Sequence, residues 1–252
     1  MKVTILGCGT SGGVPRIGGE WGACDPNEPR NRRSRSSILI AEAETTILVD
    51  TSPDMRTQLL DAEIGTVDGV IYTHEHADQC HGIDDLRVLS MNGHAQIDVY
   101  ALPHALAVLR RRFDYIFEAL PGSGYPPVAR GHEIDGAFVL GDIAFQPFIQ
   151  THGAIDSLGL RYGDIAYSND VSALSEEAFA LLDGVPVWIV DALRYKPHPT
   201  HAHLALTLEW IARVKPRRAI LTNMHVDLDY RTLCETLPDG VEPAYDGMVI
   251  EV

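Results

Sequence analysis

The feature that most constrains the fold is a series of short apolar runs, rich in valine and isoleucine, that recur along the chain. Many are bounded by glycine, aspartate or proline, and this pattern predicts β-strands. The predicted strands cover residues 3–6, 37–41, 46–49, 70–72, 98–101, 138–140, 143–147, 157–162, 165–168, 187–191, 219–222 and 248–252. Helices are predicted over residues 53–61, 103–117, 175–182 and 204–214. Strands interleaved with helices predict an α/β sandwich in which helices cover two sheets, as a single domain over residues 1–252.

The composition is that of a globular, acidic protein. The 252 residues are 45% hydrophobic, which provides a core large enough for independent folding. The formal net charge of -15 disfavours a large nucleic-acid interface, because such an interface needs a basic face. The expected partner is therefore a small molecule rather than a large nucleic acid, and a homodimer is left open.

The location of the protein is predicted from what the chain lacks. No segment approaches the roughly 20 apolar residues of a membrane helix, and residues 1–6 resemble a short strand rather than a secretory signal. The four cysteines, Cys8, Cys24, Cys80 and Cys234, show no CxxC spacing, so no disulfide framework is expected. We predict a cytoplasmic protein that does not associate with membranes.

Potential metal ligands cluster directly after the predicted strand at residues 70–72. His74, His76 and Asp78 alternate along the run Thr-His-Glu-His-Ala-Asp. Imidazole and carboxylate groups suit zinc, manganese or iron, and a loop at a strand end can turn alternate side chains toward one point. The structural alternative is a polar turn that happens to contain histidine, but three such residues in a row favour a metal site.

Further candidate ligands follow three later strands. His152, Asp170 and His225 each lie just past an apolar run. Each residue alone is also compatible with a polar strand cap, but the recurrence favours metal binding. The number of ligands fits two ions, and a two-ion site needs a bridging carboxylate. The predicted sets are His74, His76 and His152 on the first ion, Asp78 and His225 on the second, and Asp170 between them.

In these residues the sequence resembles the metallo-β-lactamase superfamily. His74, His76 and Asp78 match most of its HxHxDH motif, and the later ligands occur in the expected order. Within the superfamily it is similar to the PhnP-type phosphodiesterase branch and, more distantly, to tRNase Z. The segments that carry this similarity are residues 7–15, 31–36, 49–54 and 82–87. The resemblance implies a four-layer αββα sandwich, hydrolase activity, and one or two divalent metal ions, zinc or manganese.

Two positions of the predicted metal site depart from the motif or leave the ligand open. Gln79 stands where the motif has its last histidine, and an amide oxygen is a weaker ligand than imidazole for these metals. Gln79 stays in the predicted ligand set, with a second ion that binds weakly or is often absent. Cys80 and His81 lie beside it as potential replacements, although Cys80 is expected to be simply buried. For the last ligand, Asn223 and His225 both follow the strand, and His225 is preferred for its chemistry.

The resemblance also implies groups that assist the metal. It gives Asp50 the role of orienting the metal-binding histidines, with a helix or turn cap as the structural alternative. It makes His201 the general acid, and histidine suits that role because it titrates near neutrality. His203 is the nearest competitor and His198 the third. The predicted catalytic residues are therefore His201, Asp78 and His203.

Substrate-binding groups are predicted from side chains that suit phosphate. Arg194 and Tyr195 lie in a segment dense in histidine and arginine, and Arg87 follows the metal motif. A planar guanidinium pairs well with phosphate oxygens, although most arginines are simply solvated side chains at the protein surface. Further arginine candidates are Arg32, Arg33 and Arg35.

The leading hypothesis is hydrolysis of a small or cyclic phosphodiester, or of a nucleotide-like substrate of that kind. A metal-bound hydroxide would attack phosphorus while His201 protonates the leaving oxygen. One alternative keeps the metal site and changes the bond to a lactone or thioester, because a fold alone does not decide the chemistry. Another is a protein that binds a nucleotide or sugar phosphate with impaired catalysis, which Gln79 motivates. The net charge argues against tRNA processing.

Overall fold

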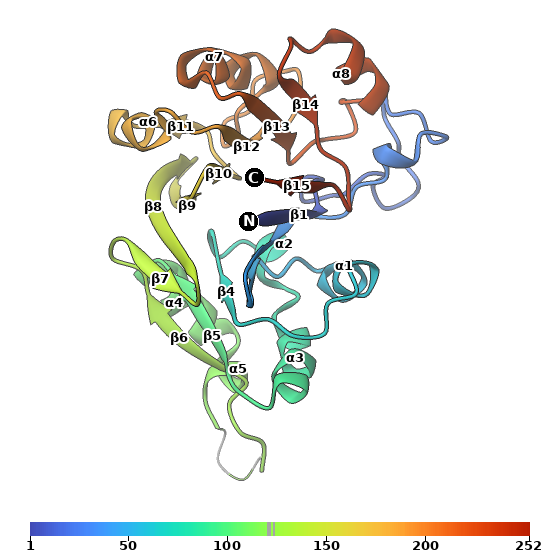
Figure 1. Cartoon of the computed structure of the whole chain (residues 1–252). Helices are drawn as coiled ribbons and strands as arrows, with labels where there is room; N and C mark the ends of the chain where they lie inside the picture. Colours follow the sequence, from blue (N-terminus) through green and yellow to red (C-terminus); the bar gives the residue numbers. More distant parts are fainter. Residues whose placement is uncertain (120–121, 123) are drawn as a thin grey trace.

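The computed structural model describes residues 1–119, 122 and 124–252. Two β-sheets pack face to face, and helices cover the outer face of each sheet (Figure 1). The predicted α/β class and four-layer αββα sandwich are therefore confirmed. The two ends of the chain lie side by side, because the first and last strands pair with each other.

The first sheet has seven strands in the order β15-β1-β2-β3-β4-β5-β6. Their bounds are β1 (Lys2–Gly7), β2 (Ser37–Glu42), β3 (Thr45–Val49), β4 (Gly69–Ile71), β5 (Ile97–Ala101), β6 (Ala129–Glu133) and β15 (Val249–Glu251). Strands β3 to β6 are parallel, and the other neighbours are antiparallel. Because parallel strands end at one edge of a sheet, the residues after β3 and β4 emerge together.

The second sheet has eight strands, in the order β11-β8-β9-β10-β12-β13-β14 with β7 paired to β8. Their bounds are β7 (Phe138–Leu140), β8 (Ile143–His152), β9 (Ile155–Tyr162), β10 (Ile165–Ser168), β11 (Ala173–Leu174), β12 (Val187–Asp191), β13 (Arg218–Thr222) and β14 (Val241–Pro243). Strands β10, β12, β13 and β14 are parallel. Their carboxyl ends therefore share one edge, and His152 is the last residue of β8.

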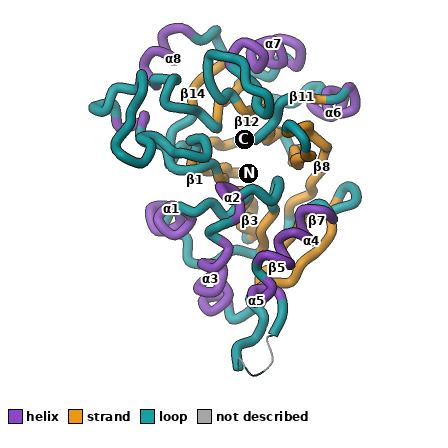
Figure 2. Tube along the Cα trace, turned by 180° about the vertical axis from the view of Figure 1, so that it is seen from behind, coloured by secondary structure: helices purple, strands orange, loops and turns teal. Residues whose placement is uncertain are grey.

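The helices form the two outer layers (Figures 1 and 2). Along the first sheet lie α1 (Met55–Asp61), α2 (Ala77–Cys80), α3 (Leu86–Gly93), α4 (Pro103–Arg112) and α5 (Asp114–Phe117). Along the second lie α6 (Glu176–Leu182), α7 (Leu204–Val214) and α8 (Tyr230–Thr236). The short 3-10 helices are η1 (Pro29–Asn31) and η2 (Ile83–Asp85). Across the described part of the chain, every helix is too short or too polar to traverse a bilayer.

Some predicted elements differ from those observed. The single helix predicted over residues 103–117 is wrong, because the chain breaks at Phe113, where φ is -131° and lies outside the helical range. The helix predicted at residue 175 begins as expected, with the Ser175 hydroxyl accepting from Ala178 N at 3.2 Å. The sequence patterns did not predict α3, α8, β6, β11 and β14.

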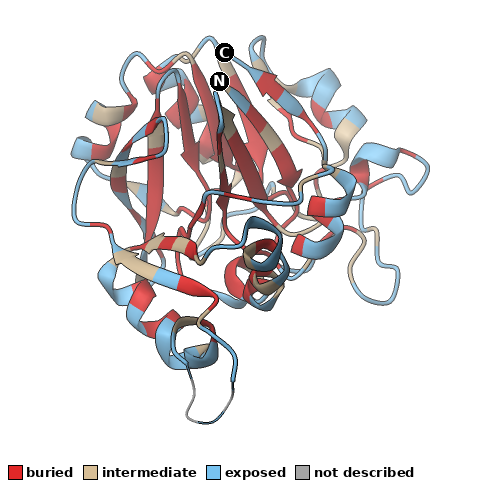
Figure 3. Cartoon of the chain, turned by 60° about the horizontal axis from the view of Figure 1, so that its bottom comes forward, coloured by how far each residue is buried: buried red, intermediate tan, exposed pale blue. Residues whose placement is uncertain are grey.

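The strands of the two sheets are largely buried (Figure 3). Alternation along the strands of the first sheet divides its side chains between two cores. Ile5 and Ile38 belong to the core between the sheets, whereas Leu6 and Leu39 pack beneath the helices of the first layer. Successive side chains of a strand point to opposite faces, so a sheet covered on both faces needs apolar residues at nearly every position. This requirement explains the near-continuous apolar runs of the sequence.

Candidate metal centre

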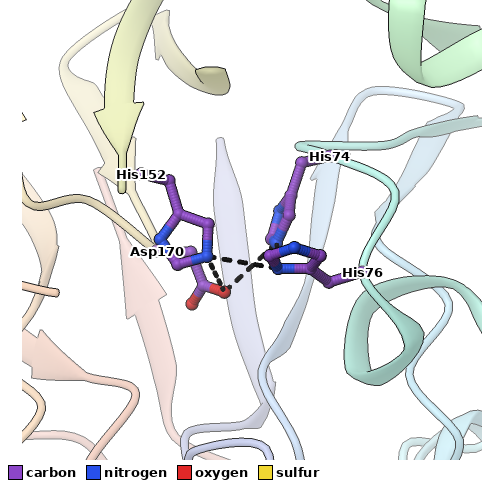
Figure 4. Close-up of side chains that lie close together, drawn as sticks. All are labelled: His74, His76, His152 and Asp170. Atoms are coloured by element: carbon purple, nitrogen blue, oxygen red, sulfur yellow. Dashed lines mark hydrogen bonds and ion pairs between the residues drawn. The ribbon is translucent and has the colours of Figure 1, made fainter. Parts of the chain in front are cut away.

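Four side chains converge where β4, β8 and β10 end, namely His74, His76, His152 and Asp170 (Figure 4). His76 Nδ1 lies 3.0 Å from His74 Nε2 and 3.2 Å from His152 Nε2. Asp170 Oδ2 lies 3.3 Å from His74 Nε2 and 3.7 Å from His152 Nε2. The structure thus brings together the three histidines predicted for the first ion and the carboxylate predicted as the bridge.

The spacing of these donor atoms fits a tetrahedral metal ion. Zinc binds histidine nitrogen at about 2.0–2.1 Å, so neighbouring ligands of a tetrahedral site lie about 3.3 Å apart. The donor distances of 3.0, 3.2, 3.3 and 3.7 Å bracket that value. His74, His152 and Asp170 are buried and His76 is exposed, so the cluster is closed on one side and open on the other. These residues therefore fit a divalent ion of the zinc or manganese type.

The pKa values of His76 and His152 suit metal binding. Burial lowers the pKa of His152 to about 4, and burial together with the charge of His74 lowers the pKa of His76. Both rings are therefore neutral at physiological pH, which is the form that binds a metal. For His74, burial also lowers the pKa, but the hydrogen bond and charge of Asp170 outweigh it and raise the pKa.

Backbone conformation at the strand ends aims the side chains of the site. Asp50, Asp170 and Asn223 follow β3, β10 and β13, with φ of 63°, 50° and 58°. Residues other than glycine rarely adopt this left-handed conformation, and where they do, the surrounding structure often serves a functional site. His76 has extended backbone and caps the start of α2, which turns the chain sharply after β4.

Asp50 supports the cluster through Thr73. Its two carboxylate oxygens accept hydrogen bonds from Thr73 N and Thr73 Oγ1, both at 2.8 Å. Thr73 Oγ1 in turn lies 3.0 Å from His74 Nδ1. Burial raises the pKa of Asp50 to about 7. A contact that fixes His74 Nδ1 leaves Nε2 for a metal, so the role predicted for Asp50 has a physical route.

His201 lies beside the cluster, with its ring centroid 4.7 Å from that of His152. His201 Nδ1 lies 3.0 Å from Oδ2 of Asp191, the last residue of β12. Burial lowers the pKa of His201, but the hydrogen bond and charge of Asp191 outweigh burial and raise it to about 9. His201 therefore holds its proton at neutral pH, as a general acid must.

Asp78 and Gln79, predicted as ligands of a second ion, both lie on α2. Asp78 is partly buried and Gln79 fully buried. In the amide orientation that satisfies its surroundings, Gln79 Nε2 donates to Asp50 Oδ2 at 3.1 Å and to Ser36 O at 3.3 Å. The amide nitrogen of Gln79 thus holds the carboxylate of Asp50, while its oxygen faces Asp78.

Cys80 and His81 do not replace Gln79. Cys80 is buried, and its Sγ lies 3.5 Å from Glu75 O. Burial raises the pKa of the Cys80 thiol to about 12, and a protonated thiol is a poor metal ligand. The His81 ring packs edge-on against Phe113, with centroids 5.9 Å apart.

The structure does not bring His225 to the cluster. Its Nε2 contacts the guanidinium of Arg16, and its Nδ1 lies 3.3 Å from Asp227 Oδ1. Asn223, the alternative at this strand end, does reach the centre, because its Nδ2 donates to Asp170 Oδ1 at 2.7 Å. The preference for His225 over Asn223 rested on side-chain chemistry, whereas the direction of the chain after β13 decides which side chain reaches Asp170.

Arg194 lies close enough to His225 for its charge to act on that ring. Its Nε donates to Lys196 O at 3.1 Å and its Nη2 to Pro197 O at 2.9 Å, which orders the turn that follows β12. Burial lowers the pKa of His225, and the charges of Arg16 and Arg194 lower it further. Arg16 and Arg194, whose charges both act on His225, are called the basic rim below, and Arg16 Nη1 also lies 3.5 Å from Glu20 Oε2.

No described interaction links the remaining predicted residues to the four ligands. Tyr195 is 46% exposed and follows Arg194. His203 caps α7 through its backbone, with Thr207 N donating to its carbonyl at 3.0 Å. Arg87 lies on α3, where its Nη2 is 3.8 Å from Asp84 Oδ1. Their predicted roles in catalysis and substrate binding stay predictions.

Sequence reasoning missed two residues of this site, Asp191 and Arg16. Asp191 ends an apolar strand, so the pattern that identified Asp170 was present there too. Arg16 gave no such signal, because its contact with His225 joins positions 209 residues apart.

A separate cavity of about 730 Å³ lies on the outer face of the first sheet, between α1 and the first long loop. It is lined by Arg16, Arg35, Leu39, Gln58 and Asp246 among others, and none of the four clustered ligands lines it. Arg16 therefore lines this cavity and also contacts His225.

Comparison with known proteins agrees with this fold and site. Residues 45–224 match the model of the Beta-lactamase superfamily domain. A solved diphosphatase from the PhnP family is 34% identical with a TM-score of 0.92, covering all of this chain and 96% of that one. The short form of human tRNase Z shares the fold, with 18% identity, a TM-score of 0.70, and coverage of 100% of this chain and 99% of that one.

A curated relative extends beyond the length of this chain. The octanoyltransferase of Porphyromonas gingivalis is 33% identical over 254 residues, which are 98% of this chain and 51% of that protein. The chain therefore spans about half the length of the curated relative it matches.

The fold and the cluster are those of the metallo-β-lactamase type. The chain belongs to the Beta-lactamase superfamily domain family, and the predicted resemblance to the superfamily, with its PhnP-type branch, is confirmed.

Proposed function

We propose that this chain hydrolyses a phosphodiester, with His201 as the general acid. The observation that carries the proposal is the His201–Asp191 pair, in which His201 Nδ1 lies 3.0 Å from Asp191 Oδ2 and the His201 ring lies 4.7 Å from the ring of His152 at the metal centre. An ion bound by the cluster would polarise a phosphoryl oxygen and lower the pKa of a bound water. The chain must then supply a proton to the leaving oxygen, because an alkoxide is a poor leaving group at neutral pH.

His201 is arranged to hold and deliver that proton. Its Nδ1 lies 3.0 Å from Asp191 Oδ2, which accepts the Nδ1 proton, and the Asn223 amide nitrogen lies 3.2 Å from the same atom. Because these contacts engage Nδ1, Nε2 is the nitrogen that can donate to a substrate oxygen. Asp191 also stabilises the imidazolium, which keeps the acid charged until the bond breaks.

The basic rim would bind the anionic groups of the substrate. Arg194 and Arg16 are always charged, and a guanidinium can pair with two phosphate oxygens. Such local positive charge matters in a chain whose net charge is -15, since the protein as a whole repels anions. An acyl ester would not need this rim, which favours a phosphate substrate.

The bond within the substrate is either a phosphate ester or a diphosphate linkage. The solved relative at 34% identity is a diphosphatase, which supports the second form. The test is to assay metal-loaded protein against bis-p-nitrophenyl phosphate, a 2′,3′-cyclic nucleotide and a nucleoside diphosphate diester. We expect turnover that a chelator abolishes and that zinc or manganese restores. If the metal-loaded protein turns over none of these three substrates, the proposal is contradicted.

Thioester hydrolysis is a second candidate. The relative named octanoyltransferase is 33% identical to almost the whole of this chain, although the chain covers only 51% of it. An octanoyl thioester in the same assay separates the two candidates. If it is the preferred substrate, and if His201→Ala and Arg194→Ala keep that activity, the thioester function replaces the phosphodiester function.

A further inference from the structure

The two carboxylate oxygens of Asp170 face different surroundings (Figure 4). Oδ2 faces His74 and His152, in what we call the three-histidine position. Oδ1 is turned away from it and faces Asn223. We call the space on this side the amide position, because Asn223 borders it and Gln79 is the residue that the sequence offers as its other ligand.

At the amide position, Asn223 acts as a hydrogen-bond donor. Its Nδ2 donates to Asp170 Oδ1 at 2.7 Å and lies 3.3 Å from Asp191 Oδ1. An N–H group has no lone pair to offer a metal, and it already neutralises part of the charge on the oxygen that a bridging carboxylate would give to a second ion. All three residues are buried, so this arrangement is shielded from competing water.

Gln79 is engaged in a similar way. Its Nε2 donates to Asp50 Oδ2 at 3.1 Å and Ser36 O at 3.3 Å, so it holds the residue that supports His74 through Thr73. In this orientation its oxygen faces Asp78, about 3.4 Å from Oδ2, and it is a neutral, hard donor that suits calcium or magnesium better than zinc.

His225, the imidazole closest in sequence to Asn223, is held elsewhere. Its Nε2 contacts Arg16, and its Nδ1 contacts Asp227. A metal ion drawn to that imidazole would also meet the positive charge of Arg16. The amide position is therefore bordered by the carboxylates of Asp78, Asp170 and Asp191 and by His201, whose Nδ1 lies 3.9 Å from Asp170 Oδ1 but is engaged by Asp191 Oδ2 at 3.0 Å. Asn223 Nδ2 fills the space between these groups, because it lies 2.7 Å from Asp170 Oδ1, 3.3 Å from Asp191 Oδ1 and 3.2 Å from His201 Nδ1.

We propose that this chain binds one zinc-type ion per molecule, at the three-histidine position, and that Gln79 and Asn223 close the amide position by hydrogen bonding. Asp170 is then a terminal ligand through Oδ2 rather than a bridge, with Oδ1 held by Asn223. This inference concerns the number of ions and is independent of the substrate, so it stands or falls separately from the proposed function.

The experiment counts ions. Protein stripped with a chelator is reloaded with zinc, dialysed, and measured by plasma mass spectrometry against protein concentration. We expect one zinc per chain, and the double variant Gln79→His/Asn223→His should take up two, because it supplies two imidazoles to the amide position. Asn92→His is the matched control, since it adds an exposed imidazole on α3, and it should keep one.

Two measurements keep the result decisive. Circular dichroism establishes that each variant is folded, and Asn223→His alone serves if the double variant is not. Electron paramagnetic resonance of manganese-loaded wild-type protein should show an isolated ion without spin coupling. Two zinc ions per wild-type chain, or a coupled manganese pair, would overturn the proposal. A folded histidine variant that still binds one ion would overturn the roles of Gln79 and Asn223.

Discussion

The three-histidine position and the amide position lie on opposite sides of Asp170 but differ in what their residues can do. The first gathers three imidazole nitrogens, with His76 Nδ1 lying 3.0 Å from His74 Nε2 and 3.2 Å from His152 Nε2. The second presents amide groups whose nitrogens donate to the carboxylates around them. The same fold therefore supports a metal ion on one side and a hydrogen-bond network on the other, and side-chain identity at two positions makes the difference.

The largest effect is expected from removing a ligand of the three-histidine position. His76→Ala should abolish metal retention and lower turnover at least about 100-fold. Even changes to residues that only hydrogen-bond to the ligands lower metal affinity or activity about 10–100-fold. His76 is exposed, so the variant should remain folded. Metal content and kcat/KM are the measurements. His104→Ala is the control, since its side chain is 74% exposed and contacts Glu75 rather than the cluster; equal losses in both variants would break the comparison.

His201→Ala tests the acid beside the three-histidine position. We expect kcat to fall about 10²–10⁴-fold, the usual contribution of a positioned general acid, while the metal content stays unchanged. A p-nitrophenolate leaving group needs less protonation than an alkoxide. The fall in kcat should therefore be smaller for a p-nitrophenyl substrate than for an alkyl diester. Equal losses for both leaving groups would count against an acid role.

Asp50→Asn tests whether the support behind His74 matters. Asparagine has the shape of aspartate but lacks its charge and one of the two oxygens that accept from Thr73. Zinc affinity should therefore fall about 10–100-fold. Competition with a chromophoric chelator measures this affinity. An unchanged affinity would mean that the Asp50–Thr73 contacts serve only the fold.

Arg194→Ala tests the basic rim. We expect KM for a diester to rise about tenfold with a smaller change in kcat, which corresponds to the loss of one charged hydrogen bond at a partly exposed site. Arg87→Ala, on α3 beside Asp84, is the comparison and should change KM less. If the effect of Arg87→Ala equals or exceeds that of Arg194→Ala, the substrate binds on the α3 side instead.

The smallest expected effect is a shift in pH dependence. Asp191 raises the pKa of His201 to about 9, so the acid is protonated below that pH and activity should fall as the pH rises through about 9. Asp191→Asn removes the charge, so this basic limb should move to lower pH. If the basic limb of the pH–activity profile does not move in Asp191→Asn, a group other than His201 controls that limb.

Much of this structure could be predicted from the sequence. Apolar runs located most strands, because buried strands need apolar residues at nearly every position, and the residues after them supplied His74, His76, His152 and Asp170. The sequence could not decide between Asn223 and His225, since both follow β13 and only the left-handed conformation of Asn223 selects the one that reaches Asp170. Arg16 could not be predicted at all, because its position depends on a contact across most of the chain.

Anomalous diffraction at the zinc edge, from crystals of the protein reloaded with zinc, tests the difference between the two positions most directly. We predict one strong peak within bonding distance of His74, His76, His152 and Asp170, and no peak between Asp78, Gln79 and Asn223. A second peak of similar height at the amide position, or none among the three histidines, would contradict this account.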